Sequence, residues 1–411
     1  MMTTNSNIPP GYKDSAVGII PQEWDVKRLV DLCHNTGDYG INAPAVSYRE
    51  DLPTYLRITD IDGWGKFIET DKVSVDNPNS SQFILRDGDI VFARTGATVG
   101  KTYLYDSKDG QLVFAGFLIR FTPNSNKAVP YYIKACSETA SYWNWVRVIS
   151  QRSGQPGINS VEYGAMKLAV PPMEEQRKIA EILGMWDEAI EKQSRLIEKL
   201  ELRKRALMQR LLTGRTRLPG FTTPWQKVKL GEIFKERNET KCEHLPLLSI
   251  TAERGVILQS ESDKKDTSND DKSKYKRICP NDIGYNTMRM WQGRSALSAM
   301  EGIVSPAYTI VTPKVGIDPL FISELIKQPR VVYDFWTHSQ GLVGDTLNCK
   351  FHDFSQVKVA IPSLPEQKAI AEVLTAADNE INIHRKKLDA LRLQKRGLMQ
   401  QLLTGKTRVK I

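Results

Sequence analysis

The feature that most constrains this chain is a long internal repeat. The 47 residues from Pro171 (PPMEEQRKIAEILGMWDEAIEKQSRLIEKLELRKRALMQRLLTGRTR) return without a gap from Pro362, at an offset of 191 residues, and 22 of these positions are identical. Two copies of one segment are expected to fold alike. The repeat therefore predicts a chain with internal pseudo-twofold symmetry.

Both copies have the pattern of one long helix. Pro172 or Pro365 stands where a helix can begin, and Gly214 or Gly405 follows a basic last turn and stops it. Apolar residues recur at alternating spacings of four and three, which is typical of a coiled-coil seam. The seam residues are Ile179, Leu183, Trp186, Ile190, Ile197, Leu200, Leu207 and Leu211 in the first copy, and Ile370, Leu374, Ala377, Ile381, Leu388, Leu391, Leu398 and Leu402 in the second.

Each seam needs a partner, and the simplest partner is the other seam. A helix of about 38 residues would be roughly 57 Å long, which is too long for one small domain to cover. We therefore expect an intramolecular antiparallel coiled coil. Polar residues interrupt both seams, and a register that keeps polar with polar places Gln193 opposite Lys395 and Lys204 opposite His384.

Two larger blocks, residues 1–170 and 219–361, alternate with the repeat copies. Short motifs recur in them in the same order, such as WDVKRL from Trp24 and WQKVKL from Trp225. Each block contains β-branched and aromatic runs broken by Gly, Pro and Asn, with a helical stretch after Pro130 or Pro319. The sequence predicts an α+β fold in four parts: a domain over 1–170, a helix over 171–218, a second domain over 219–361 and a second helix over 362–411.

Composition excludes several classes of protein. No apolar run approaches the roughly 18 residues of a membrane span, and Met1–Ala16 is polar, so we expect a cytoplasmic location. The net charge is +9, but the segments 171–218 and 362–411 carry +3 and +5 of it, so bulk charge alone is weak support for nucleic-acid binding. No C-x-x-C pair occurs, so we expect free thiols and no metal site at the five cysteines, Cys33, Cys136, Cys242, Cys279 and Cys349.

One stretch has the look of a phosphate-binding loop. Gly96–Thr102 (GATVGKT) follows a predicted strand, but three residues separate its glycines where such a loop needs four, and no convincing helix follows. No nucleophile elbow, zinc-protease motif, dinucleotide fingerprint or adenine-methyltransferase tetrapeptide is found. We therefore expect no catalytic residues, and keep an ATPase that uses this loop as an alternative.

Two unlike domains alternating with two nearly identical helices resemble the specificity subunit of type I restriction-modification systems. The resemblance rests on Pro171–Gln176 with Ile179–Leu183, on Pro362–Gln367 with Ile370–Leu374, and on the two Leu-Leu-Thr-Gly endings. It implies that each α+β domain is a target-recognition domain that reads one half of a bipartite, asymmetric site in double-stranded DNA. The helices would set the spacing between the halves and dock two modification (methyltransferase) subunits and the restriction subunits.

The resemblance also implies where the cofactors lie. S-adenosylmethionine would be bound by the modification subunit, and ATP and Mg²⁺ by the restriction subunit. This chain would bind none of them. A stand-alone two-domain DNA-binding regulator is the alternative within the DNA-binding class.

Candidate DNA contacts are polar side chains on loops that follow predicted strands. Arg pairs well with guanine, and Asn or Gln with adenine, although any one of these side chains could instead position a phosphate or remain solvated. The candidates are Arg94, Thr95, Lys101, Arg152, Gln155 and Asn159 in the first domain, and Thr287, Arg289, Gln292, Arg294, Gln340 and Asn348 in the second.

Overall fold

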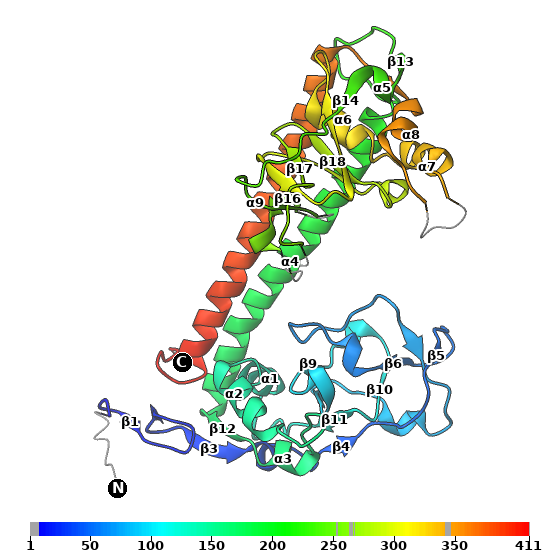
Figure 1. Ribbon diagram of the computed structural model, residues 1–411. Coiled ribbons are helices and arrows are strands. Elements are labelled where there is room, and N and C mark those ends of the chain that lie inside the picture. Colours follow the sequence, from blue (N-terminus) through cyan, green and yellow to red (C-terminus); the bar gives the residue numbers. More distant parts are fainter. Residues whose placement is uncertain (1–7, 252–253, 263–265, 267, 342–346, 411) are drawn as a thin grey trace. The chain divides into compact units, whose positions relative to one another are not determined.

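The computed structural model describes residues 8–251, 254–262, 266, 268–341 and 347–410 (Figure 1). The chain divides into two units. Unit 1 consists of residues 1–193 and 387–411, and unit 2 of residues 194–386. The two long helices, α4 (Met173–Leu211) and α9 (Leu364–Leu402), each contribute one part to both units.

Unit 1 contains two four-stranded sheets. The first has the order β10-β6-β7-β5, and the second is antiparallel with the order β4-β11-β8-β9. Their strands are β10 (Leu112–Phe114), β6 (Thr54–Leu56), β7 (Val73–Ser74), β5 (Val46–Ser47), β4 (Asp38–Tyr39), β11 (Leu118–Phe121), β8 (Ile90–Ala93) and β9 (Thr102–Leu104). Unit 1 also contains the pair β1 (Tyr12–Lys13) and β2 (Ile20–Pro21), the pair β3 (Asp25–Arg28) and β12 (Lys167–Val170), the helices α1 (Pro130–Cys136), α2 (Ala140–Ile149) and α3 (Ser160–Gly164), and short 3-10 helices.

Unit 2 has one four-stranded antiparallel sheet and three strand pairs. The sheet has the order β14-β21-β18-β19, with β14 (Phe234–Glu236), β21 (Tyr308–Pro313), β18 (Ile283–Asn286) and β19 (Ser295–Leu297). The pairs are β15 (Leu248–Thr251) with β16 (Gly255–Leu258), β17 (Lys276–Ile278) with β20 (Gly302–Val304), and β13 (Gln226–Lys229) with β22 (Lys358–Ile361). The short helices are α5 (Leu230–Ile233), α6 (Pro319–Leu325), α7 (Pro329–His338) and α8 (Phe351–Gln356).

The two units follow one plan. The sheet β4-β11-β8-β9 corresponds to β14-β21-β18-β19, strand for strand, and the pair β3-β12 corresponds to β13-β22. In each unit the second strand of that pair leads directly into a long helix, β12 into α4 and β22 into α9 (Figure 1). The predicted mixed α+β fold with a pair of long helices is confirmed.

Within each unit the long helices run antiparallel. In unit 1, Lys395 of α9 donates to Asp187 of α4 at 2.7 Å. In unit 2, Lys204 of α4 donates to Asp378 of α9 at 2.6 Å. The second pair is the first one moved by the repeat offset of 191 residues with the helices exchanged. The pseudo-twofold symmetry is therefore visible in individual contacts.

The predicted register was wrong. Each lysine reaches a carboxylate six residues before its predicted partner: Lys395 contacts position 187 rather than Gln193, and Lys204 contacts position 378 rather than His384. A carboxylate offers a part-buried ammonium ion a charge-assisted hydrogen bond, whereas an amide cannot neutralise it. Pairing polar with polar was too coarse a rule, because the aspartates lie outside the seam.

The predicted seam residues are buried or half-buried in both helices. Several of them do more than join the helices. Ile179, Leu183 and Leu402 belong to the apolar core of unit 1. Ile370 and Leu374 belong to that of unit 2. Each helix thus also forms part of a domain core.

All five cysteines are free thiols. Burial raises the pKa of Cys33, Cys136 and Cys349 to about 12. Within the described ranges, no group of three or more His, Cys, Asp or Glu residues is arranged to hold a metal ion. A helix long and apolar enough to cross a membrane is likewise not found in the described part of the chain.

Candidate nucleic-acid interface

The motifs at the ends of the repeat clasp the two helices together. Arg408 donates from Nε and Nη2 to Glu175 at 2.7 and 2.9 Å. Arg217 donates in the same way to Glu366, at 2.5 and 2.6 Å. Both glutamates are fully buried. The basic LLTGRTR and LLTGKTR endings therefore supply a bidentate partner for a buried carboxylate at the start of the other helix.

A glutamine fastens each helix to the domain beside it. Gln176 accepts from the Val129 backbone N–H at 2.9 Å and donates to the Pro171 carbonyl at 2.9 Å. Gln367 makes the equivalent pair of bonds with the Asp318 N–H and the Pro362 carbonyl, at the same distances. The Glu-Gln motifs thus fix the position of each domain on its helix.

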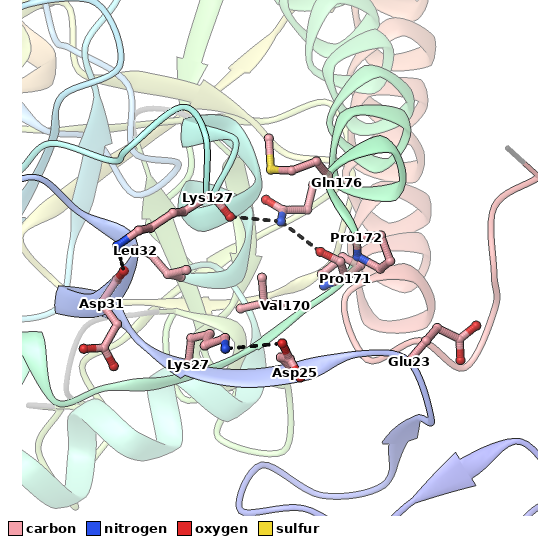
Figure 2. Close-up of a pocket in the computed structure, with 11 residues that line it drawn as sticks. Glu23, Asp25, Lys27, Asp31, Leu32, Lys127, Val170, Pro171, Pro172 and Gln176 are labelled. Atoms are coloured by element: carbon pink, nitrogen blue, oxygen red, sulfur yellow. Dashed lines mark hydrogen bonds and ion pairs between the residues drawn. The ribbon is translucent and has the colours of Figure 1, made fainter.

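A hollow of about 660 Å³ lies where β3 and β12 meet the start of α4 (Figure 2). Lys27 pairs with Asp25 at 3.3 Å, and Lys127 donates to the Asp31 carbonyl at 3.0 Å. Gln176, at its inner side, is held by the bonds described above. Charges of both signs are mixed along this hollow, so it presents no concentrated charge to an anion or a cation.

In unit 1 two loops meet beyond the end of β8. The Gly96 N–H donates to the Pro156 carbonyl at 3.0 Å, and the Ile158 N–H donates to the Arg94 carbonyl at 2.8 Å. Thr95 forms an isolated bridge with Gly157. Gln155 lies against Gly96, whose φ of +73° and lack of a side chain allow this close approach. The structure therefore brings the predicted residues Arg94, Thr95 and Gln155 together.

The Arg94 guanidinium lies over the ring of Tyr39, 4.7 Å from its centroid. No hydrogen-bond acceptor for this guanidinium is found among the described residues, so its N–H donors are open to a ligand. The Tyr39 hydroxyl accepts from the Ser160 N–H at 3.1 Å. Partial burial raises the pKa of Tyr39, but the bond from Ser160 and the nearby Arg94 charge outweigh it and lower the pKa overall. Sequence reasoning did not select Tyr39, because no pattern in the sequence links a residue of β4 to the loop after β8.

Three other candidates of unit 1 have partners within the protein. Lys101 donates to the Ile61 carbonyl at 2.8 Å, so its ammonium group is not presented as in a phosphate-binding loop. Arg152 donates to both carboxylate oxygens of Glu162. Asn159 accepts from the Glu162 N–H at 2.9 Å and caps α3. Each of these three side chains therefore has a hydrogen-bond partner within the protein and does not need a ligand to satisfy it.

Unit 2 repeats the meeting of two loops. The Cys349 N–H donates to the Thr287 carbonyl at 2.9 Å, which is the counterpart of the bond from Ile158 to Arg94. The loop after β18 exposes Arg289, Gln292 and Arg294, and no partner for their side chains is found in the described ranges. These three side chains are therefore available for contacts outside the chain.

The last two candidates of unit 2 lie on the second loop. Gln340 and Asn348 are joined by two backbone hydrogen bonds of 2.9 and 2.8 Å. The side chain of Gln340 donates to Asp353 at 3.1 Å. The buried Oδ1 of Asn348 has no hydrogen-bond partner in the described part of the chain. Thr287, which begins the first loop, donates from its hydroxyl to the Ala307 carbonyl.

A hollow of about 560 Å³ lies beside these loops and is lined by Thr287, Asn348, Lys276, Lys350 and His352, among others. Neither lysine side chain has an ion-pair partner within the described residues. Sequence reasoning did not select the lysines or the histidine, because Lys276 lies on a strand in a strongly charged region and Lys350 and His352 flank the start of a six-residue helix. Glu236 also lines this hollow, so charges of both signs meet here, and the two lysine side chains are the groups that fit contacts with a phosphate backbone.

Comparison with known proteins agrees with this architecture. Residues 21–202 and 322–393 match the model of a family described as the type I restriction modification DNA specificity domain. The chain is 27% identical to the MjaX specificity subunit of a type I restriction enzyme of Methanocaldococcus jannaschii, with 97% of each protein covered. It is 24% identical to the MjaVIII specificity subunit of the same organism, over 95% of this chain and 94% of that one.

Two solved structures have the same fold. One is a chain from a study of complex assembly and conformational transition of the type I R-M system, with a TM-score of 0.56 and 16% identity over 94% of this chain and 99% of that one. The other is the type I restriction-modification S subunit from M. genitalium, with a TM-score of 0.55 and 13% identity over 98% of each chain. Since the family model matches more than half of the chain, including most of both long helices, the protein belongs to the family of type I restriction-modification DNA specificity domains.

Proposed function

We propose that this chain reads a bipartite, asymmetric DNA site for a type I restriction-modification complex, one half-site with each unit. The observation that carries the proposal is the equivalence of the two loop pairs. The bond from Ile158 to Arg94 and the bond from Cys349 to Thr287 join the same two loops in the two units. The framework is the same in both, so a different set of donors on each unit reads a different sequence.

The polar side chains on these frameworks suit direct readout of bases. Unit 1 offers Arg94, oriented by Tyr39, together with Gln155, whereas unit 2 offers Arg289, Gln292 and Arg294. Arginine can donate two hydrogen bonds to guanine and glutamine can pair with adenine, and one such contact discriminates between bases by about 1–3 kcal/mol. We assign Arg94 and Arg289 as the central contacts.

In this proposal, other subunits catalyse the methylation and restriction reactions. Two modification subunits would bind S-adenosylmethionine and methylate the site, and restriction subunits would use ATP and Mg²⁺. This chain would bring DNA recognition and no cofactor of its own, and would act in the cytoplasm, where the chromosome is accessible. The alternative of a stand-alone regulator requires that the chain bind its site tightly without these partners.

Methylome sequencing tests the proposal. A host without its own adenine methyltransferases would express this chain with the modification subunit of the same system, and each protein alone. We expect a split, asymmetric motif only on co-expression. Arg94→Ala should alter one half of the motif and Arg289→Ala the other, while Arg210→Ala, at an exposed helix position, should alter neither.

Two results would contradict the proposal. One is the absence of any motif when both proteins are soluble and the methyltransferase is active. The other is a change in both halves of the motif on substitution of a single arginine. Tight binding of one DNA sequence by the chain alone would favour the regulator instead.

A further inference from the structure

Phe117 is a large apolar side chain that the fold leaves in contact with water. It lies in the tight turn between β10 and β11, and 57% of its surface is exposed. Ala115 and Leu118, which begin and end this turn, are buried in apolar cores of unit 1. Phe117 itself belongs to no apolar core in the described part of the unit. Its ring is therefore available for a contact outside the chain.

Hydrogen bonds hold the backbone at Phe117 in place. The Leu118 N–H donates to the Ala115 carbonyl at 2.8 Å and closes the turn. The backbone N–H of Arg94 donates to the Phe117 carbonyl at 3.0 Å and ties the turn to the loop after β8. A ligand that contacts the ring thus meets an ordered backbone, which lowers the entropy cost of binding.

Phe117 and Arg94 are neighbours on the recognition framework. β8 and β11 are antiparallel with Ala93 opposite Leu118, so Arg94 and Phe117 are the next two residues in register. Opposite residues of an antiparallel pair direct their side chains to the same face of the sheet. The guanidinium of Arg94 lies over the ring of Tyr39 on this face. Unit 1 therefore presents a hydrogen-bond donor and an apolar ring side by side.

Unit 2 shows that the framework does not require a ring at this position. There the Thr287 N–H donates to the Ala307 carbonyl at 3.3 Å, as the Arg94 N–H does to the Phe117 carbonyl. Ala307 directly precedes β21, just as Phe117 directly precedes β11. Because the same backbone arrangement forms around an alanine, the ring of Phe117 serves something other than the fold.

We propose that Phe117 reads a thymine through its 5-methyl group, beside the base that Arg94 reads. The 5-methyl group of thymine is the apolar group that base edges present in the major groove, and phenylalanine is among the side chains that contact it. Arginine beside it would pair with guanine. This inference rests on the proposed function and extends it, because the half-site read by unit 1 would then contain a thymine whose methyl group contributes to affinity.

Replacing thymine with deoxyuridine tests the contact, because deoxyuridine pairs in the same way and lacks only the 5-methyl group. Fluorescence anisotropy would measure binding of duplexes with the methylated motif to the complex of the full chain and its modification subunit. Each thymine of the half-site that Arg94→Ala alters would be replaced in turn. The wild-type complex should bind one of these duplexes about fourfold more weakly, the value of one buried methyl-sized group.

Phe117→Ala should abolish this difference. The variant should bind the thymine and deoxyuridine duplexes equally, because no ring remains to contact the methyl group, and it should bind both more weakly than the wild type binds the thymine duplex. A general defect in DNA binding would instead weaken both and keep the fourfold difference. Thermal melting shows whether the variant is folded, as the alanine in unit 2 leads us to expect.

Tyr48 provides a matched control. It is an aromatic residue of the same unit with 48% of its surface exposed, and it follows β5 in the other four-stranded sheet. Tyr48→Ala removes an exposed ring of similar size away from the loop after β8. This variant should keep the wild-type difference between the thymine and deoxyuridine duplexes.

The outcomes separate this inference from the proposed function. If the wild-type complex does not distinguish its motif from a scrambled duplex, the proposed function fails and the inference falls with it. If the wild type reads its motif but no deoxyuridine weakens binding, or if folded Phe117→Ala keeps the difference, Phe117 does not read a thymine. Loss of the difference in Tyr48→Ala as well would also overturn the inference. If Phe117→Ala changes only association of the chain with itself, the ring contacts a second copy of this chain instead of DNA.

Discussion

Replacing Arg217 with methionine tests the ion pair between Arg217, just after α4, and Glu366 at the start of α9. The arginine makes two hydrogen bonds to Glu366, whose side chain is 1% exposed, while its own side chain is 26% exposed. Methionine keeps much of the arginine's apolar stem but leaves a buried carboxylate without a cation. Breaking a buried ion pair on one side costs about 3–5 kcal/mol, and the partial exposure of Arg217 favours the lower end, about 3 kcal/mol.

The expected consequence is a lower melting temperature for unit 2. In a unit of this size 1 kcal/mol corresponds to roughly 2–4 °C, so Arg217→Met should lower the Tm by about 6–12 °C. Differential scanning calorimetry of the full chain is the suitable assay, because two units need not unfold in one transition. Adding Glu366→Gln should recover part of the loss, since it removes the unpaired charge.

The exposed Arg210 provides the control, because no ion-pair partner for it is found in the described residues. Arg210→Met should change the Tm by no more than about 1 °C, as is usual for a surface substitution. If Arg217→Met has no larger effect than Arg210→Met, the ion pair between Arg217 and Glu366 contributes nothing measurable to stability, and a buried carboxylate here does not need a cation.

Three further results are expected. Lys395→Met leaves the part-buried Asp187 without its cation, while Glu138 keeps its ion pair with Lys134, and should lower the free energy of unfolding of unit 1 by about 2 kcal/mol, as measured by urea denaturation; an unchanged midpoint would contradict this. At pH 8 a thiol reagent should modify Cys242 well before Cys349, because burial raises the pKa of Cys349 to about 12 and keeps its thiol protonated; since that pKa lies above the value in the unfolded chain, its contribution to stability is present below about pH 9 and is lost as the pH rises toward 12. Tyr39→Ala removes the ring beneath Arg94 and should weaken discrimination at one base pair by about 1 kcal/mol, seen as increased methylation of near-cognate sites; unchanged selectivity would show that Tyr39 does not position Arg94.

The sequence was sufficient to predict the long helices and their antiparallel pairing, because the repeat and its apolar spacing are strong signals over many residues. It was insufficient for the register. Lys395 was assigned to Gln193 by matching seam positions, whereas Asp187, outside the seam, is its partner. A lysine in the seam can pair with a carboxylate beside the seam. The spacing of apolar residues identifies the seam positions but not the charged residues that flank them.

The sheets and the details of the loops were also beyond the sequence. Strands such as β5 and β7 are two residues long, too short for any alternation of apolar residues to show. For the loops, the position of Arg94 after a strand could be read from the pattern. Its contact with Tyr39, and the hydrogen bond from Lys101 to the Ile61 carbonyl, depend on residues far away in the sequence.

The shared helices also set an order of assembly during synthesis. Unit 2 is one uninterrupted stretch, residues 194–386, so every residue it needs has been made before synthesis reaches position 387. Unit 1 is built from two separate stretches, and Arg408 must reach Glu175 before its clasp can close. Most of the first domain leaves the ribosome first, yet it is the second unit whose contacts can be completed first. Before the end of α9 has been made, the apolar surface of unit 1 that Met399, Leu402 and Leu403 will cover is open to solvent. The nascent chain is most prone to aggregate during this interval.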